Sequence, residues 1–364
     1  SRNIIKSNNA IIAAQAATTA FSTYNKILKL HKIAQTFNYS IDYSRQQSKQ
    51  IGSQELATNE IYNQPDVSLN ISYIPEPNFS NEVQGRFLNS TPKDEFKNMF
   101  DAGDSEDSIN FYVLVSENQE DSFVDSIPFD TLASFSGDDA IAFGNCFPES
   151  YSLSYAVGDL PKVNTSYICS NVVFDNLTGT SMEMPAINMT GGNNDNVGRC
   201  SFGFTKDLST SALEKSPPIV NPTNSGSDIT LQNLQVGGQE ISGKHLVQSV
   251  NMNVSMPRVS AYGLGNDYAF GRKRQFPANG TFSVSSQVSG FESGAMTGVL
   301  DSDQLYQFDL TLEASGKTMI YRIEDAKLGS SNYSMDINGR MNFDANFTFQ
   351  VTQNKGLKLS GTYY

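Results

Sequence analysis

The stretch Ala34-Gln-Thr-Phe-Asn-Tyr-Ser-Ile-Asp-Tyr-Ser-Arg45 carries the pattern from which the fold can be predicted. Its apolar and aromatic side chains alternate with polar ones, which indicates a β-strand covered on one side only. The later stretch Gln248-Ser-Val-Asn-Met-Asn-Val-Ser-Met-Pro-Arg258 has the same alternation and also ends in arginine. Two equivalent strands are therefore expected at positions far apart in the chain.

The similarity between these regions extends over roughly 55 residues, and the copies begin about 214 residues apart, a length typical of domains and not of solenoid repeats. Each copy continues with a loop that contains glycine, Gly52 in the first and Gly263 with Gly265 in the second. A further alternating run follows at 67–73 and at 280–286. We therefore predict a mainly β fold that contains two tandem β domains.

The chain divides into four expected segments. Residues 8–30 are rich in Ala, Leu and Lys and lack Pro and Gly, which favours a short N-terminal helix. Gly, Pro, Asn and Ser are frequent in 176–235, which indicates a connector with local structure. The expected segments are an N-terminal helical arm at 1–33, a first β domain at 34–175, a connector at 176–235 and a second β domain at 236–364.

Charge argues against a protein that grips DNA. The formal net charge of the 364 residues is −13, whereas non-specific DNA binding needs clustered Lys and Arg that release counterions from phosphate. The basic cluster Arg272-Lys-Arg274 is expected in a solvated loop; a contact between rings with acidic loops and, after that, a contact with nucleic acid are the alternatives. The acid-rich segment 93–139 is expected to form solvated loops. A calcium site at Asp101, Asp104, Glu106 and Asp107 is the alternative, although their spacing does not match an EF-hand loop.

No residues are predicted to act in catalysis, to bind a cofactor or to bind a metal. The three cysteines, Cys146, Cys169 and Cys200, form no CxxC pair and are expected to be free thiols. The two histidines, His31 and His245, lack ligand-forming neighbours. No apolar run is long enough to span a membrane, and no clear signal peptide is expected. An enzyme is therefore the least favoured class.

The chain resembles tail tube proteins (major tail proteins) of tailed bacteriophages. In the first copy the resemblance rests on Gln35–Arg45, on Pro65-Asp-Val-Ser-Leu-Asn-Ile-Ser-Tyr73 and on Ser150-Tyr-Ser-Leu-Ser-Tyr-Ala-Val-Gly-Asp-Leu-Pro161. In the second copy it rests on Val250–Arg258 and on Tyr262-Gly-Leu-Gly265. The resemblance implies tail-tube-like domains of the β-sandwich or barrel type, in which one sheet joins those of its neighbours to line a channel.

The resemblance also implies how the chain assembles. Tubes of this family have six domains per ring, so two tandem domains imply trimeric, pseudo-hexameric rings that stack into a tube; a hexamer of chains is the alternative. Terminator, baseplate or tip proteins, and a sheath, are further implied partners. The chain is expected in the virion tail after assembly in the host cytoplasm, with no membrane partner and no cofactor.

A tube that conducts DNA during ejection needs a wall to which phosphate does not bind. The polar sides of the alternating strands are therefore the candidates for the lumenal surface, and solvent or an outer layer is the alternative location for them. These candidates are Asn38, Ser40, Asp42, Ser68, Asn70, Ser72, Asn251, Asn253 and Ser255.

Two other classes remain open from the sequence. One is a different virion β-protein, such as a tail-tip, baseplate or capsid decoration component. The other is a secreted adhesin or carbohydrate-binding module, because Asn-, Ser- and Thr-rich β domains are common in that class. The odd cysteine count argues against the second of these.

Overall fold

The fold was derived from a computed structural model of the whole chain. The structure describes residues 10–16, 25–30, 33–43, 45–49, 51–52, 54, 56–61, 66–100, 108–115, 139–156, 158–176, 181–183, 199–204, 229–232, 235–236, 239–240, 245–261, 271–288, 305–314, 317–334 and 342–362.

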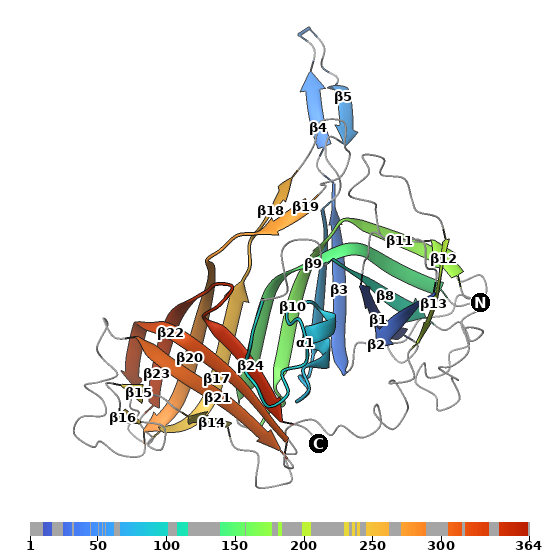
Figure 1. Cartoon of the computed structure of the whole chain (residues 1–364). Helices are drawn as coiled ribbons and strands as arrows, with labels where there is room; N and C mark the ends of the chain where they lie inside the picture. The colour runs from blue at the N-terminus through green and yellow to red at the C-terminus, as the bar shows by residue number, and fades with distance from the viewer. Residues whose placement is uncertain are drawn as a thin grey trace.

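Strands dominate the described residues, as predicted, and the first half of the chain contains one short helix (Figure 1). Its elements are β1 (Ala10–Ala16), β2 (Asn25–Leu30), β3 (Ala34–Asp42), β4 (Arg45–Lys49), β5 (Leu56–Ile61), β6 (Asp66–Tyr73), α1 (Ser80–Gln84), β7 (Lys97–Asn98), β8 (Ile109–Val115), β9 (Asp139–Ala156), β10 (Lys162–Cys169), β11 (Asn171–Asn176), β12 (Ser181–Glu183) and β13 (Arg199–Phe204).

The described elements of the second half are all strands. These are β14 (Ile229–Gln232), β15 (Gln235–Val236), β16 (Gln239–Glu240), β17 (His245–Ser255), β18 (Arg258–Ala261), β19 (Gly271–Arg274), β20 (Ala278–Val288), β21 (Tyr306–Ala314), β22 (Lys317–Ser334), β23 (Asn342–Val351) and β24 (Leu357–Thr362).

A continuous antiparallel sheet crosses the molecule and contains strands from both halves. Its order is β3-β6-β10-β9-β17-β20-β23-β22, and the junction between the halves is the pair β9–β17. Two smaller sheets, β1-β8-β9-β11 and β14-β21-β22-β24, contribute the second layer of each half. The long strands β9 and β22 each belong to both layers, so each half is a two-layer β structure.

The two halves have the same strand order. Strand by strand, β3, β6, β10 and β9 correspond to β17, β20, β23 and β22 in the shared sheet, and β1, β8 and β11 correspond to β14, β21 and β24 in the second layer. The hairpins β4–β5 and β18–β19 occupy the same place in this order. The predicted duplication therefore appears in the topology, while the domain boundaries 34–175 and 236–364 stay predictions because one sheet runs through both halves.

Local irregularities confirm the correspondence residue by residue. The register of the first hairpin shifts at Gln35 in one half and at Gln248 in the other. The long strands have left-handed residues at equivalent places, Asn145 (φ 48) in β9 and Asp325 (φ 55) in β22. Both lie at a bulge where the strand passes from one layer to the other. Asn and Asp tolerate this conformation better than most residues, which explains their use at both bends.

The predicted N-terminal helical arm is wrong for the described part of 1–33. Residues 10–16 form β1, which pairs along its whole length with β8, and 25–30 form β2. Every residue of β8 is buried. The helix propensity of alanine is only a weak preference, and pairing with a buried strand overrides it. Ala13 and Ala14 are accordingly buried.

The predicted connector 176–235 contains local structure in its described parts, the strands β12, β13 and β14. β14 pairs with β21 of the second half. The loop that follows β3 carries its own hairpin, β4–β5, and Gly52 lies in its turn with φ 89, a conformation that favours glycine. Gly263 and Gly265 lie outside the described residues.

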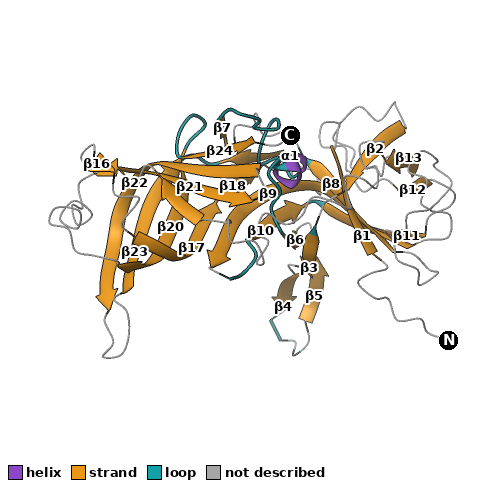
Figure 2. Cartoon of the chain, turned by 90° about the horizontal axis from the view of Figure 1, so that it is seen from below, coloured by secondary structure: helices purple, strands orange, loops and turns teal. Residues whose placement is uncertain are grey.

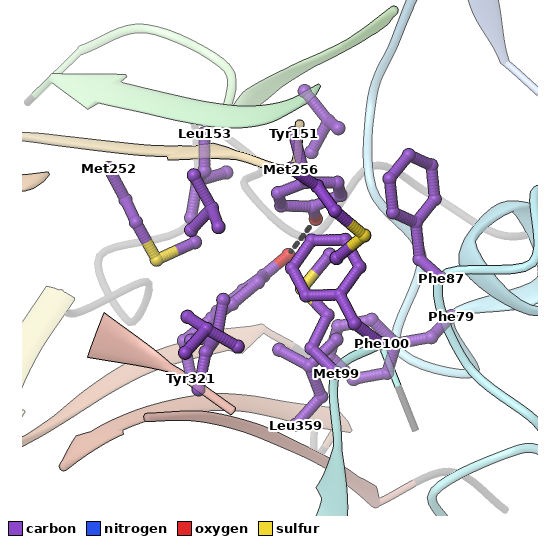
Figure 3. Packing of buried hydrophobic residues seen from close by; sticks show 14 of the residues in the cluster. Phe79, Phe87, Met99, Phe100, Tyr151, Leu153, Met252, Met256, Tyr321 and Leu359 are labelled. Carbon is purple, nitrogen blue, oxygen red and sulfur yellow. Dashed lines mark hydrogen bonds between the residues drawn. The ribbon is translucent and has the colours of Figure 1, made fainter. Parts of the chain in front are cut away.

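The core is continuous across the junction of the halves (Figure 3). Segment 74–100, with α1 and β7, covers the shared sheet on one side, as Figure 2 shows. From this segment the ring of Phe87 contacts that of Tyr151 on β9, and Phe79 contacts Tyr321 on β22, with centroid distances of 5.3 and 5.6 Å. β7 pairs with β24. The first half therefore packs against the second through both sheet pairing and aromatic contacts.

Candidate functional site

One face of the shared eight-stranded sheet is polar from edge to edge. Cross-strand neighbours on this face form a row that crosses all eight strands: Thr36, Ser72, Asn164, Ser152, Asn253, Thr281, Thr348 and Lys327. The next polar row crosses seven strands: Asn38, Asn70, Ser166, Ser150, Ser255, Asn279 and Gln350. We call this surface the polar face.

The row between these two has the opposite character. It includes Tyr151, Val254 and Phe349, which are buried. Side chains on a strand alternate between the two faces of its sheet, so the polar and apolar rows lie on opposite faces. The alternation seen in the sequence thus extends over eight strands.

All nine predicted lumenal candidates lie on the polar face, six on β3 and β6 of the first half and three on β17 of the second half. Seven of them, in β3, β6 and β17, are exposed. Ser68 is half-buried, and Ser72 is buried at 3% exposure, with its hydroxyl in contact with that of Thr36. The structure therefore brings the candidates together on one surface. Whether that surface lines a channel stays a prediction.

The polar groups of this face bind one another across the strands. Hydroxyl pairs join Thr36 to Ser72, Ser40 to Ser68 and Ser150 to Ser166 at oxygen–oxygen distances of 2.5, 2.7 and 2.6 Å. In the second half, the amide of Asn346 donates to the hydroxyl of Ser330. Such pairs use up hydrogen-bonding capacity within the sheet without placing charge on its surface.

A hollow of about 290 Å³ lies on the polar face at the junction of the halves. It is lined mainly by hydroxyl and amide side chains, which come from β9, β17 and β20: Ser152, Ser154, Asn251, Asn253, Thr281 and Ser283. The polar residues of β9, β10, β20 and β23 on this face are not among the predicted candidates. In β9 the alternation of Ser150-Tyr-Ser-Leu-Ser-Tyr155 is a signal that could have found them.

A buried acid lies on the opposite, apolar side of the sheet. Glu82 of α1 is 0% exposed, and its Oε1 accepts hydrogen bonds from the hydroxyls of Tyr73 and Tyr151 at 3.0 and 3.1 Å. The Tyr151 hydroxyl also lies 3.1 Å from that of Tyr321, which comes from the second half. Burial raises the pKa of Glu82 to about 7, although the tyrosine hydrogen bonds oppose this rise.

This cluster has a structural role at the junction, because solvent does not reach its members. Burial raises the pKa of Tyr73, Tyr151 and Tyr321 well above their ordinary value, so these side chains stay neutral. Sequence reasoning missed Glu82, since a single glutamate in a short segment carries no periodic signal.

The basic cluster Arg272-Lys-Arg274 is not a solvated loop, contrary to expectation. It forms β19, where Arg272 is 1% exposed, and the guanidinium of Arg258 on β18 lies 5.2 Å from the ring centre of Phe147. Arg258 donates to the carbonyl of Pro148, and Arg274 donates to that of Phe100. Burial lowers the pKa of Arg258 to about 9. The arginines thus attach the base of the β18–β19 hairpin to the first half, because their stems and planar heads pack on aromatic and backbone groups.

Other predicted features are tested only in part. Cys146 and Cys169 are buried free thiols, as expected, and the side chain of Cys200 lies outside the description. The acids of 101–107 and 116–138 also lie outside it. Among the described residues, no three His, Cys, Asp or Glu side chains gather as a metal site requires. Within the same part of the chain, no helix has the length and apolar character needed to cross a bilayer.

Comparison with known proteins gives matches among solved structures only. No family model and no curated protein sequence matches the chain. The SPP1 tail tube structure is similar at 12% identity and a TM-score of 0.31, covering 49% of this chain and 82% of its own. Two gene transfer agent structures, a tail and a virion, are similar at 12% and 14% identity, each with a TM-score of 0.24. They cover 33% and 37% of this chain and 88% and 95% of their own.

Proposed function

We propose that this chain is a structural subunit of a bacteriophage tail tube, with the polar face as the wall of a channel that conducts DNA during ejection. The observation that carries the proposal is the extent of the polar face. It is continuous over eight strands and both halves, and Ser, Thr and Asn dominate it. An ordinary solvent-facing sheet has no need to be this uniform.

The chemistry of the polar face suits a channel wall for DNA. Phosphate binds proteins mainly through Lys and Arg, which release condensed counterions. Among the described residues of the polar face, few are charged, and both signs occur: Asp42, Asp66, Lys162, Lys327 and Asp344. Several of the hydroxyl groups bind one another or backbone carbonyls across the strands, which uses part of their donor capacity within the sheet. DNA can therefore move along this surface without a strong site to hold it.

The duplication of the β structure within the chain bears on the number of chains in a ring. Two halves with the same strand order already share one sheet, so a chain contributes two equivalent wall units. We propose rings of three chains with pseudo-sixfold symmetry, stacked into a tube in the virion tail; a ring of six chains is the alternative. Terminator and baseplate or tip proteins would contact the ends of such a tube.

Microscopy of the purified full chain tests the proposal. We expect tubes or stacked rings with a central channel in negative stain, and threefold symmetry in averaged end views. The variant Asn253→Cys, labelled with a gold-maleimide cluster before assembly, should add density at the channel wall. Glu95→Cys is the matched control, because Glu95 is exposed on segment 74–100, which covers the opposite side of the sheet.

Three outcomes would contradict parts of the proposal. Gold density from Asn253→Cys on the outer wall of correctly formed tubes would remove the polar face from the channel. Sixfold end views would replace the trimer with the hexamer. A stable monomer that binds carbohydrate would favour an adhesin or carbohydrate-binding module instead of a tube protein.

A further inference from the structure

Equivalent strands of the two halves differ in whether a neighbour covers them. β17 pairs with β20 on one side and with β9 on the other, so both of its edges are used. Its counterpart β3 pairs with β6 alone among the described residues. At the opposite end of the sheet, residues 327–334 of β22 pair with β23 alone in the same part of the chain. Within the described part of the chain, the shared sheet therefore has one unpaired edge at each end.

Side-chain burial follows the same difference. The apolar residues Val250, Met252 and Val254 of β17 are 0%, 1% and 0% exposed. Their counterparts are Phe37 and Ile41, which are half-buried, and Tyr39, which is 39% exposed.

The strands β11 and β24 of the second layer also differ in side-chain burial. Phe174 of β11 is 59% exposed, whereas its counterpart Leu359 of β24 is 0% exposed where β7 covers that strand. Tyr39 and Phe174 lie together, with ring centres 6.4 Å apart, so the uncovered groups form one apolar patch at the β3 edge. The patch corresponds to the surface that the first half buries on the second.

We infer that β3 of one copy pairs antiparallel with β22 of a second copy, in the register that β17 and β9 use within the chain. The inference deepens the proposed function and rests on it only in requiring that copies assemble with each other. The chain itself supplies the template, because β22 corresponds to β9 and β3 corresponds to β17. Open strand edges of this kind pair readily with another chain.

The template fixes the register residue by residue. Within the chain, Ser255, Asn253 and Asn251 face Ser150, Ser152 and Ser154. The bulges at Gln35 and Gln248 align β3 with β17, and those at Glu149 and Gly329 align β9 with β22. The pairs expected between copies are therefore Asp42 with Ser330, Ile41 with Ser331, Ser40 with Asn332, Tyr39 with Tyr333, and Asn38 with Ser334.

The register is chemically consistent on both faces of the sheet. It places Ser40 and Asn332 together in the polar face, and it places Tyr39 opposite Tyr333 on the apolar side. A shift by one residue would bring apolar side chains into the polar face, which strand pairing strongly disfavours. Aromatic cross-strand pairs also stabilise a sheet. Repeating the same junction at every boundary continues the polar face from one copy to the next.

Cysteine cross-linking of the full chain tests the pairing. In assembled material under mild oxidation, Ser40→Cys with Asn332→Cys should form disulfides between copies, seen as dimers and trimers on non-reducing gels. Facing residues of paired strands lie about 4.5–5.5 Å apart at Cα, within the range for a disulfide. Tyr39→Cys with Tyr333→Cys tests the adjacent pair, in case one pair type has unfavourable geometry.

Matched controls calibrate the rate of disulfide formation. Asn253→Cys with Ser152→Cys is the equivalent pair inside the chain and should cross-link without a change in mass. Ser40→Cys with Ser330→Cys differs in register by two residues, and we expect it to cross-link at least about tenfold more slowly, because its Cα distance exceeds about 7 Å. Each single-cysteine variant reports any contribution from the native thiols.

The result can separate the inference from the proposed function. Rings or tubes in which neither facing pair cross-links faster than the shifted pair would overturn the inference and leave the proposed function intact. A chain that stays monomeric at all concentrations, without cross-links between copies, would overturn both. Rapid cross-linking of the facing pairs alone supports the β3–β22 junction.

Discussion

The two faces of the shared sheet are built from the same strands but differ in the polarity and burial of their side chains. On the polar face, hydroxyls and amides bind across strands and remain near solvent. On the apolar face, large aromatic residues surround the buried carboxyl of Glu82. The comparison shows that adjacent residues in one strand can have very different costs of substitution, because each belongs to a different surface.

The largest expected contrast lies between neighbours in β17. Met252→Asp would bury a carboxylate in the core at the junction of the halves, where Met252 is 1% exposed. We expect it to lower the free energy of unfolding by about 4 kcal/mol or more. Asn253→Asp places the same group on the exposed polar face, and we expect a change within about 0.5 kcal/mol.

Urea denaturation followed by circular dichroism measures both variants. Equal destabilisation by the two substitutions would show that the polar face is packed against something in the isolated chain, and the distinction between the faces would fail.

A smaller contrast concerns pH and Glu82. Its pKa is raised to about 7 in the folded chain, so the folded state binds more protons than the unfolded state between about pH 4.5 and 7. This acid therefore makes the fold less stable as pH rises through that window. Glu82→Gln should remove the effect, making the variant more stable than the parent chain by an amount on the order of 3 kcal/mol at pH 8.

Denaturation midpoints at pH 5 and pH 8 test this prediction through the difference between the two proteins. Tyr73, Tyr151, Tyr321 and Glu76 are the titratable groups that act on this carboxyl, and the tyrosines stay neutral across the range. A difference that does not change with pH would mean that Glu82 is ionised throughout.

The smallest expected effect tests the hydroxyl contact between the halves. Tyr321→Phe removes the group that lies 3.1 Å from the Tyr151 hydroxyl but keeps the ring contact with Phe79. Since Tyr151 retains its bond to Glu82, we expect a loss of about 1 kcal/mol. Thermal unfolding measures this loss. Tyr333→Phe is the matched control, because Tyr333 of β22 is half-buried, and no measurable change is expected for it. A loss above about 3 kcal/mol would indicate that the hydroxyl organises the whole cluster.

Much of the fold could be predicted from period-two alternation. The runs at 34–43, 67–73 and 250–256 show it clearly because one face of each strand is polar and the other apolar; the apolar face is buried in β6 and β17 and partly exposed in β3. The helix expected at 8–30 failed because pairing with a fully buried strand outweighs alanine's local preference. The buried positions of Arg272 and Glu82 were not predictable, since they depend on elements distant in sequence that meet only in the folded chain.

The candidate surface was only partly predictable for a related reason. The candidates on β3, β6 and β17 lie on the polar face, while their place in a channel stays a prediction. The alternation of Ser150, Ser152 and Ser154 gave an equal signal, but strand order is needed to know that β9 lies beside β17. Sequence patterns therefore identify which side of a strand is polar, while the pairing partners decide how far a polar surface extends.

The long strands β9 and β22 have a mechanical consequence. Each bends at a left-handed residue, Asn145 or Asp325, and continues from one layer of its half into the other. The layers are thus joined by unbroken backbone as well as by side-chain packing. A shearing force that would slide one layer over the other must stretch covalent bonds or unfold the bend, so each half should behave as a stiff body under load.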